Sequence, residues 1–385
     1  MKKKVLFAVV TSLFLAACGG GDKDQAAAPA PSPEPIDQAA GPSKVLNIYN
    51  WSDYVDPQTV TDFERAHKVK IRYDYYDSNE TLEGKVLTGK SGYDLVGPSN
   101  GFVGRQIQAG AYQKIDKSKI PNYELISPAL LEKMAMTDPG NEYVVPFFWG
   151  INTLAINVDK VKEALGTDKL PDNEWDLVFN PEYAQKLKSC GISLLDSPFE
   201  MYPVAMNYVG VDPQSSEKED LDQATEMLRK VRPFIKRFSS SGYIDDMARG
   251  DLCVAVGYGG DLNIAKRRAE ETNNGVKLSV LVPKTGFGVW IDSFAIPVDA
   301  QNLDNAYAYI NNALEPKVAA KNGDFVTYAP SSTPAKALMD KQFSQDRSIF
   351  PSDDDMKNGF VMLPKEPKMV RYSVKQWQGL KSGQK

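Results

Sequence analysis

Aromatic and acidic side chains stand next to one another at several points where strands or helices are expected to end. These points are Trp51, Ser52, Asp53 and Tyr54, then Glu200, Tyr258 to Asp261, Trp290 to Asp292, and Tyr328. Any one of them alone is more often a helix cap, a solvated charge or part of the core. Aromatic faces attract ammonium groups by about 0.5 to 2 kcal/mol each and also cover methylene chains. With carboxylates neutralising each end, such a set would bind an aliphatic diamine or triamine.

Much familiar enzyme chemistry lacks the residues that it needs. The chain has one histidine, His67, and three cysteines, which excludes most Ser/His/Asp triads, multi-histidine zinc sites and Cys/His proteases. The formal net charge of −5 includes three lysines at positions 2 to 4, and without them it would be −8. We do not expect so acidic a chain to bind nucleic acid. We expect no metal site and no cofactor.

One segment matches a nucleotide-binding motif in its letters but not in its context. Residues 84–91, GKVLTGKS, have the G-x-x-x-x-G-K-S pattern of a phosphate-binding loop. Such a loop must follow a strand and open a helix, so that backbone N–H groups face the phosphates. Here the first glycine falls inside an expected helix, Gly89 ends that helix, and the strand comes afterwards. We interpret the match as a helix end followed by a turn.

The start of the chain is typical of an exported lipoprotein. Residues 1–17 combine three lysines, a short apolar run and small residues, as in a secretory signal peptide. Residues 15–18, LAAC, resemble a bacterial lipobox, which predicts a lipid anchor on Cys18 and a periplasmic, membrane-anchored protein. The alternative is a cleaved signal with an incidental cysteine. Residues 18–43 are rich in Gly, Ala and Pro and are expected to form a disordered tether.

The other two cysteines are a natural pair, because an exported protein meets an oxidising compartment. A bridge between Cys190 and Cys253 would enclose about 60 residues and stabilise the fold by about 4 kcal/mol through loop-closure entropy. Two buried free thiols are the alternative.

From Val45 onward, short apolar strands alternate with helical faces. We expect strands at 45–49, 70–76 and 93–99, and helices at 55–67 and 78–89. Strands separated by helices imply a parallel, wound sheet with ligand positions at the carboxyl ends of its strands. Residues 50–54 and Ser99 stand at such ends.

A second lobe is expected beyond a long strand at 144–158, which would cross from one lobe to the other. The expected elements there are strands at 192–196 and 252–258, a helix at 199–208, an amphipathic helix carrying Leu221, Ala224, Leu228 and Val231, and a returning strand at 289–298. We expect a first lobe of residues 44–149 with about 293–325. The second lobe would contain residues 150–292 with about 326–385.

Seven segments, in order and spacing, resemble the periplasmic polyamine-binding proteins of spermidine/putrescine ABC importers. They are NIYNWSDYV, YDLVGPS, FFWGINTLAINVDKV, KSCGISLLDSPFE, GDLCVAVGYGGD, IDSFAIPVDA and KNGDFVTYAP. The resemblance implies an α/β protein with the class II periplasmic-binding-protein fold, two wound α/β lobes joined by crossing hinge strands. It also implies a non-catalytic, monomeric receptor that hands a polyamine to membrane permease subunits.

The family's binding residues can be carried over position by position. The first lobe would supply Trp51, Ser52, Asp53, Tyr54 and Ser99, and the rest of the site would be Glu200, Tyr258, Asp261, Trp290, Asp292 and Tyr328. Among these, Asp292 matches the aspartate most closely tied to a ligand ammonium. The disulfide of the putrescine-binding branch falls on Cys190 and Cys253.

Four positions bear on which polyamine is bound. Tyr258 stands where the relatives commonly have Trp, and Met362 lies near a Gln of the spermidine binder. Asp261 matches the putrescine branch, whereas Trp290 matches spermidine-preferring members. We expect both ligands to bind, with spermidine favoured by about 1 kcal/mol, or about fivefold.

Two other classes of function are compatible with parts of the sequence. In a secreted glycosidase, carboxylates such as Asp53 and Asp292 would act as acid and base on a sugar. A surface lipoprotein with an interaction role would also be acidic and lipidated. The wound two-lobe pattern favours the binding protein over both alternatives.

Overall fold

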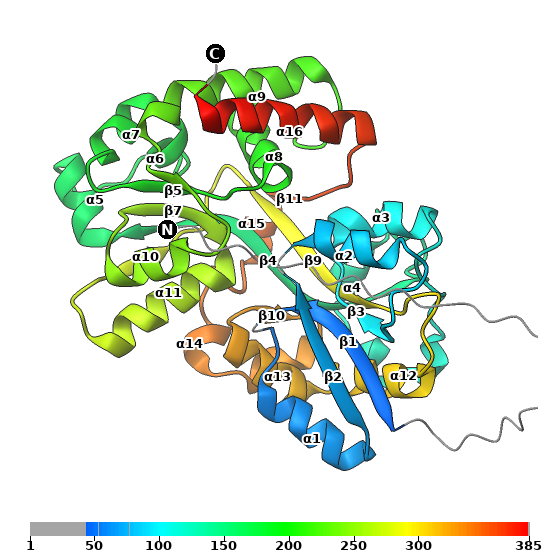
Figure 1. Cartoon of the computed structure of the whole chain (residues 1–385). Coiled ribbons are helices and arrows are strands. Elements are labelled where there is room, and N and C mark those ends of the chain that lie inside the picture. Colours follow the sequence, from blue (N-terminus) through cyan, green and yellow to red (C-terminus); the bar gives the residue numbers. More distant parts are fainter. Residues whose placement is uncertain (1–43, 53, 77, 384–385) are drawn as a thin grey trace, which may run out of the picture. The chain divides into compact units, whose positions relative to one another are not determined.

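The computed structural model describes residues 44–52, 54–76 and 78–383, in which eleven strands form one sheet (Figure 1). The strand order is β2-β1-β3-β9-β4-β7-β5-β6, while β8 and β10 pair with β4 and β11 pairs with β9. The strands are β1 (Val45–Trp51), β2 (Lys70–Tyr76), β3 (Leu95–Val96), β4 (Val144–Asn157), β5 (Ile192–Leu194), β6 (Arg237–Phe238), β7 (Val254–Tyr258), β8 (Leu278–Val280), β9 (Phe287–Ala295), β10 (Ala329–Pro330) and β11 (Gly359–Val361).

Helices connect and cover these strands. The α-helices are α1 (Pro57–His67), α2 (Asn79–Val86), α3 (Asn100–Gln108), α4 (Pro128–Met134), α5 (Val158–Leu165), α6 (Asp176–Phe179), α7 (Pro181–Leu187), α8 (Pro198–Tyr208), α9 (Lys218–Val231), α10 (Tyr243–Arg249), α11 (Gly259–Thr272), α12 (Leu303–Ala313), α13 (Pro316–Val326), α14 (Lys341–Ser344), α15 (Asp353–Met356) and α16 (Pro367–Ser382). The 3₁₀ helices are η1 (Lys117–Lys119), η2 (Pro121–Leu125), η3 (Arg232–Phe234) and η4 (Thr333–Leu338).

The first lobe is the parallel, wound sheet that the sequence predicts. β1 pairs in parallel with both β2 and β3. Its residues alternate between buried and partly exposed, as expected for a strand with one face against the core. Between β1 and β2, α1 begins after Asp56, whose side chain accepts a hydrogen bond from the Gln58 backbone N–H, and it ends at Lys68 in the left-handed conformation.

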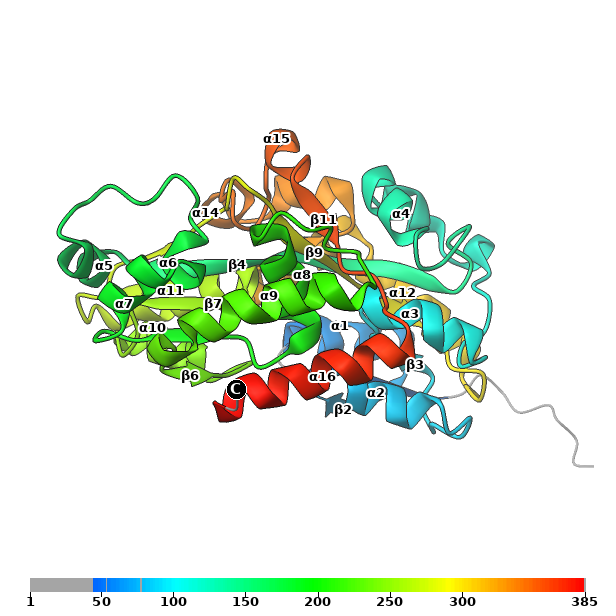
Figure 2. The same ribbon diagram turned by 90° about the horizontal axis from the view of Figure 1, so that it is seen from above.

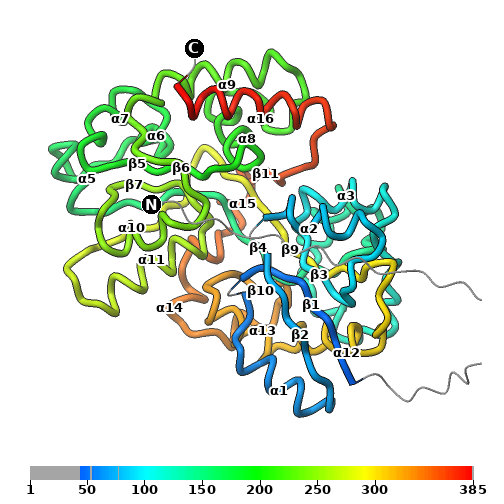
Figure 3. Tube along the Cα trace, in the orientation of Figure 1, coloured from blue at the N-terminus to red at the C-terminus, as the bar shows by residue number. Residues whose placement is uncertain are grey.

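Two long antiparallel strands join the lobes. β4 and β9 pair from Val144 opposite Ala295 to Asn152 opposite Gly288, and nearly every residue on them is buried. In the tube drawing they pass between the β1–β3 part and the β5–β7 part of the sheet (Figure 3). The prediction of two crossing strands is therefore confirmed.

The second lobe is built around β7, which pairs in parallel with β5 and antiparallel with β4. The C-terminal helix α16 packs beside α9 and against α8, as the view from above shows (Figure 2). Trp377 of α16 is buried in this core, and its indole N–H donates to Asp196 at 3.0 Å.

One expected lobe boundary divides elements that pack together. Ala335 of η4 and Met339 form a buried cluster with Ala319 and Ala320 of α13. A boundary at about 325 would place α13 in one lobe and η4 in the other. The apolar packing keeps η4 with α13, and the lobe boundary near 325 stays a prediction.

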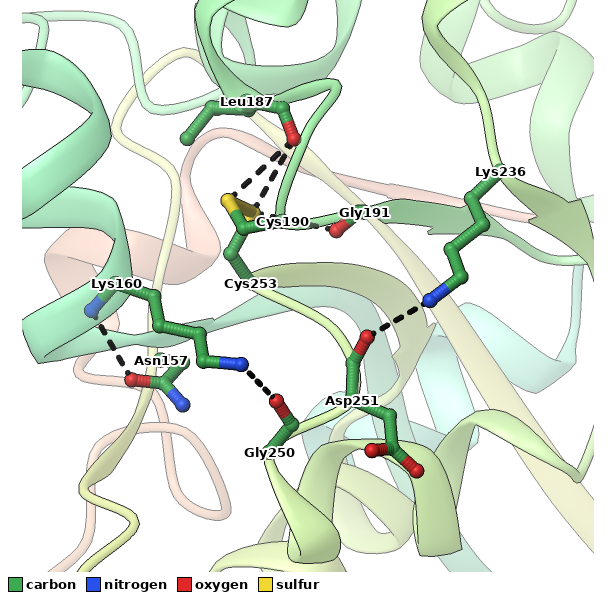
Figure 4. The surroundings of a disulfide bond; sticks show 9 residues. All are labelled: Asn157, Lys160, Leu187, Cys190, Gly191, Lys236, Gly250, Asp251 and Cys253. Carbon is green, nitrogen blue, oxygen red and sulfur yellow. Dashed lines mark hydrogen bonds between the residues drawn. A yellow bond between two sulfur atoms is a disulfide. The ribbon is translucent and has the colours of Figure 1, made fainter.

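A disulfide joins Cys190 and Cys253, as the sequence predicts, with their Cα atoms 5.4 Å apart (Figure 4). It ties the turn after α7 to the residue before β7, where the Cys253 backbone N–H also donates to the Gly191 carbonyl at 3.0 Å. The bridge therefore closes a loop that contains α8, one of the helices that carry the predicted site.

The motif at 84–91 does not have the geometry of a phosphate loop. Gly84 lies within α2, Gly89 adopts φ +65° in the turn that follows, and the strand β3 comes after both. The helix ends slightly earlier than predicted, with Leu87 as its cap. The predicted signal peptide, Cys18 and the tether lie outside the described residues. Among the described helices, none has the length and apolar character needed to span a membrane.

Candidate functional site

The structure gathers most of the predicted residues where the strands of both lobes end. Asp292 lies on β9, Glu200 on α8, and Asp261 on α11 directly after β7. Five more predicted residues contact these carboxylates or one another: Tyr54, Ser99, Tyr258, Trp290 and Tyr328. Trp51 makes no hydrogen bond to these carboxylates; its indole N–H donates to the Gly97 carbonyl at 3.1 Å. Ser52 is exposed, and Asp53 lies outside the described residues.

Asp292 accepts two hydroxyl hydrogen bonds from segments far away in the sequence. Tyr54 donates to Oδ2 at 2.6 Å and Ser99 donates to Oδ1 at 2.5 Å. Ser99 is itself held by Asn79, whose amide donates to its Oγ and accepts from its backbone N–H, both at 3.0 Å. Burial raises the pKa of Asp292 to about 6, while the hydroxyl donors act in the opposite direction. The first lobe therefore solvates this carboxylate.

Asp261 also accepts hydrogen bonds from two hydroxyl groups. Tyr328 donates to Oδ1 at 2.8 Å and Tyr243 donates to Oδ2 at 2.9 Å. Burial raises the pKa of Asp261, and both tyrosines lower it. The Tyr243 hydroxyl additionally accepts the backbone N–H of Tyr258 at 3.1 Å, so one phenol fixes both the carboxylate and the neighbouring aromatic residue.

Glu200 lies in the first turn of α8, which Ser197 caps by accepting the Glu200 backbone N–H. Its carboxylate accepts the Asn152 side-chain N–H at 2.5 Å and has a longer contact of 3.5 Å with the Tyr258 hydroxyl. Burial raises the pKa of Glu200 to about 7, and the Asn152 hydrogen bond lowers it. Glu200 is thus kept neutral more easily than Asp292.

Aromatic rings connect the three carboxylates. Trp290 packs edge-on against Tyr328 at 4.9 Å between centroids, and Tyr258 meets Trp290 at 6.2 Å. Two rings rest directly on glycine. A Cβ at Gly150 would lie 2.4 Å from Cζ2 of Trp290, and one at Gly260 would lie 2.2 Å from Cε1 of Tyr328. The backbone at these two glycines therefore fixes the positions of the Trp290 and Tyr328 rings.

Another ring links the two lobes beside the carboxylates. Phe199, the residue before Glu200, packs edge-on against Phe102 of α3 at 5.5 Å. A Cβ at Gly101 would lie 2.0 Å from Cζ of Phe199, so this ring occupies the place of a side chain on α3. Because Ser99 directly precedes the same helix and donates to Asp292, the contact couples Glu200 to Asp292.

The three carboxylates form no ion pair in the described residues, although the more distant charge of Arg268 lowers the pKa of Asp261. None of Asp292, Glu200 and Asp261 belongs to an ion pair there, and all their described hydrogen bonds come from hydroxyl or amide groups. Buried charges are costly unless an opposite charge compensates them. Surrounded by aromatic faces, the arrangement is suited to a ligand with two or more positive charges.

Sequence reasoning missed three polar residues that orient the carboxylates: Asn79, Asn152 and Tyr243. Asn152 carries a readable signal, because it is a lone amide within the apolar stretch GINTLAI of a buried strand. Asn79 directly follows the helix cap Ser78, where an amide side chain is common and does not indicate a binding site. Tyr243 has no local signal, since its role depends on the packing of α10 against α11 and β7.

The fold and site place this chain among the bacterial extracellular solute-binding proteins, the family that it matches over residues 58–351 and to which it belongs. It is 44% identical to the putrescine-binding periplasmic protein SpuD of Pseudomonas aeruginosa strain UCBPP-PA14, over 89% of this chain and 94% of that protein. It is also 44% identical to the putrescine-binding periplasmic protein PotF of Escherichia coli K12, over 89% and 93%.

The fold agrees with solved structures of similar proteins. One is the spermidine/putrescine ABC transporter substrate-binding protein PotD from Streptococcus pneumoniae, with a TM-score of 0.75 and 28% identity over 89% of this chain and all of that one. A second, a spermidine/putrescine ABC transporter protein from Listeria monocytogenes, has a TM-score of 0.76 and 30% identity. The predicted class II periplasmic-binding-protein fold is confirmed.

Proposed function

We propose that this protein is a periplasmic receptor that binds putrescine or spermidine and delivers it to the permease of an ABC importer. The observation that carries the proposal is a set of three carboxylates, Asp292 and Glu200 buried and Asp261 partly buried, which are joined by aromatic rings and form no described ion pair. The relatives named for putrescine and for spermidine/putrescine support the same ligand class. The protein is a binding protein and not an enzyme.

The ligand contacts come from both lobes, which supports a hinge about β4 and β9. Tyr54 and Ser99 belong to the first lobe and Glu200 to the second, so an open form would satisfy only part of a diamine. Binding then favours the closed form. We place residues 44–149, about 293–325 and the η4 region in the first lobe. The second lobe contains residues 150–292 and α16.

Calorimetry with putrescine, cadaverine, spermidine and spermine tests the function. We expect one ligand per protein, with putrescine and spermidine both bound, and small-angle scattering is expected to show contraction on ligand addition. The absence of heat and of thermal stabilisation with all four amines would contradict the proposal. A glycoside panel serves as the parallel assay for hydrolytic activity, which we expect to be absent.

A monomeric, lipid-anchored form in the periplasm completes the proposal. The LAAC segment at 15–18 supports lipidation of Cys18 after removal of the signal peptide. Labelled fatty acid is expected on the exported wild-type protein and not on Cys18→Ala. Label that persisted on the variant would exclude this anchor and leave the binding function untouched.

A further inference from the structure

A buried amide beside Glu200 has one of its two polar ends unused. Asn152 is 1% exposed in the middle of β4, and its Nδ2 group donates to Oε2 of Glu200 at 2.5 Å. Its Oδ1 atom is also buried and accepts no hydrogen bond in the described part of the chain. Buried polar atoms are usually paired, because leaving one unpaired costs free energy. A missing donor is therefore implied at this position.

The orientation of the amide follows from the charge of its neighbour. An ionised Glu200 can only accept hydrogen bonds, so the N–H side of Asn152 must face it and the carbonyl side must face away. Turning the amide round would set two acceptors against each other. The unused oxygen is thus a consequence of the Glu200 contact.

The described residues that face Asn152 supply no other donor for this oxygen. In the strand register Asn152 lies opposite Tyr258 on β7 and Gly288 on β9. Gly288 has no side chain, and a Cβ there would lie 3.3 Å from Asn152 Nδ2 and 2.8 Å from the sulfur of Met362. The Tyr258 hydroxyl is directed to Glu200 instead. The charged groups that act on Glu200 are Asp292 and Glu80, and both are acceptors.

We propose that Asn152 is a specificity-determining residue whose Oδ1 atom accepts a hydrogen bond from the ligand ammonium that pairs with Glu200. This inference rests on the proposed function and deepens it. A terminal ammonium carries three N–H donors, so it can satisfy the carboxylate and the amide oxygen together. A monoamine held at Asp292 leaves this end unfilled. Asn152 therefore favours ligands with a second ammonium.

The test compares putrescine with 1-butylamine, which has the same carbon chain and one ammonium. In the Asn152→Leu variant, which replaces the amide with an apolar group of similar size, we expect putrescine affinity to fall at least tenfold. Butylamine affinity should change less than threefold. Asn152→Ser keeps a group that can both donate to Glu200 and accept from the ligand, and it should retain more of the putrescine advantage than the leucine variant does.

A matched control lies on the same strand. Asn157 at the outer end of β4 is buried and caps α5 by accepting the Lys160 backbone N–H. Asn157→Leu is expected to lower the melting temperature without changing the ratio of the two affinities. If Asn152→Leu does not fold, Asn152→Ser measured against Asn157→Ser decides the question.

Two different failures can be told apart. Equal losses for putrescine and butylamine in the Asn152 variants would mean that the residue only supports the fold, which overturns this inference. A wild-type protein that binds neither amine would overturn the proposed function itself. An unchanged putrescine affinity in Asn152→Leu would show that the oxygen does not meet the ligand.

Discussion

Two carboxylates of the site, Asp292 and Glu200, are held in different ways. Asp292 accepts two short hydroxyl hydrogen bonds, at 2.6 and 2.5 Å, from Tyr54 and Ser99. Glu200 has one short amide contact, from Asn152, and one long contact of 3.5 Å with Tyr258. Burial raises both pKa values, to about 6 for Asp292 and about 7 for Glu200.

The difference shows which carboxylate the protein stabilises in its ionised form before the ligand binds. Neutral donors that point at a carboxylate stabilise its ionised form, so the protein itself supports the charge of Asp292. Glu200 has weaker support and depends more on a ligand cation. We therefore expect the Asp292 end to contribute more to affinity and the Glu200 end to make binding depend on pH.

The largest effect is expected from Asp292→Asn. Removing one member of a desolvated charge pair typically costs about 2 to 5 kcal/mol, so putrescine affinity should fall by about thirtyfold or more. Glu200→Gln is the matched comparison and should cost less, because this carboxyl is more readily neutral. Calorimetry of both variants at pH 7, where about half of Glu200 is ionised, measures the difference. A greater loss at Glu200 would reverse the proposed order of the two ends.

The second prediction concerns pH. Because the pKa of Glu200 is about 7 before binding, a diamine should displace its proton at pH 6, and affinity should rise about tenfold between pH 6 and pH 8. Calorimetry in two buffers of different ionisation heat will detect the released proton. In Glu200→Gln most of this dependence should disappear, whereas an unchanged profile would remove Glu200 as its source.

The unliganded protein should show the opposite trend in stability. A carboxyl whose pKa is raised by folding holds a proton that the unfolded chain has released, so stability is highest below the unfolded pKa. For Glu200 it should decline as the pH rises from about 4.5 through about 7. Thermal melts without ligand test this sign, with Glu200→Gln as the control.

A smaller effect is expected from Phe199→Ala, which weakens the coupling between the two ends. The Phe199 ring packs on Gly101 and is partly exposed. Its removal should therefore cost only about 1 kcal/mol of binding free energy, or about fivefold in affinity. Phe325→Ala removes the same ring from an exposed position and should have no effect. Equal affinities for the two variants would show that Phe199 does not couple the Glu200 side of the site to the Asp292 side.

The smallest effect concerns ligand length. Trp290 offers a broad face between the ends, and its indole N–H has no described partner. Trp290→Phe should therefore keep binding but lower the spermidine-to-putrescine affinity ratio, by at most about fivefold. An unaltered ratio would show that this ring does not measure the chain between the two ammonium groups.

The sequence predicts the elements well where apolar periodicity is strong. The strand at 70–76 has the predicted bounds, and the crossing strand is one residue shorter than expected, 144–157 instead of 144–158. The packing of Ala335 on α13 was less predictable, because it depends on a contact between helices and not on a local pattern. Tyr243 could not be found for the same reason.

Gly150, Gly260 and Gly101 support aromatic rings from behind. A mutant library that varies these glycines should yield few functional clones, since any side chain there collides with a ring. Diversity placed at the rings themselves, at positions 290, 328 and 199, keeps the supporting main chain intact. An effort to evolve new ligand preferences from this scaffold should therefore randomise the aromatic residues and leave the glycines fixed.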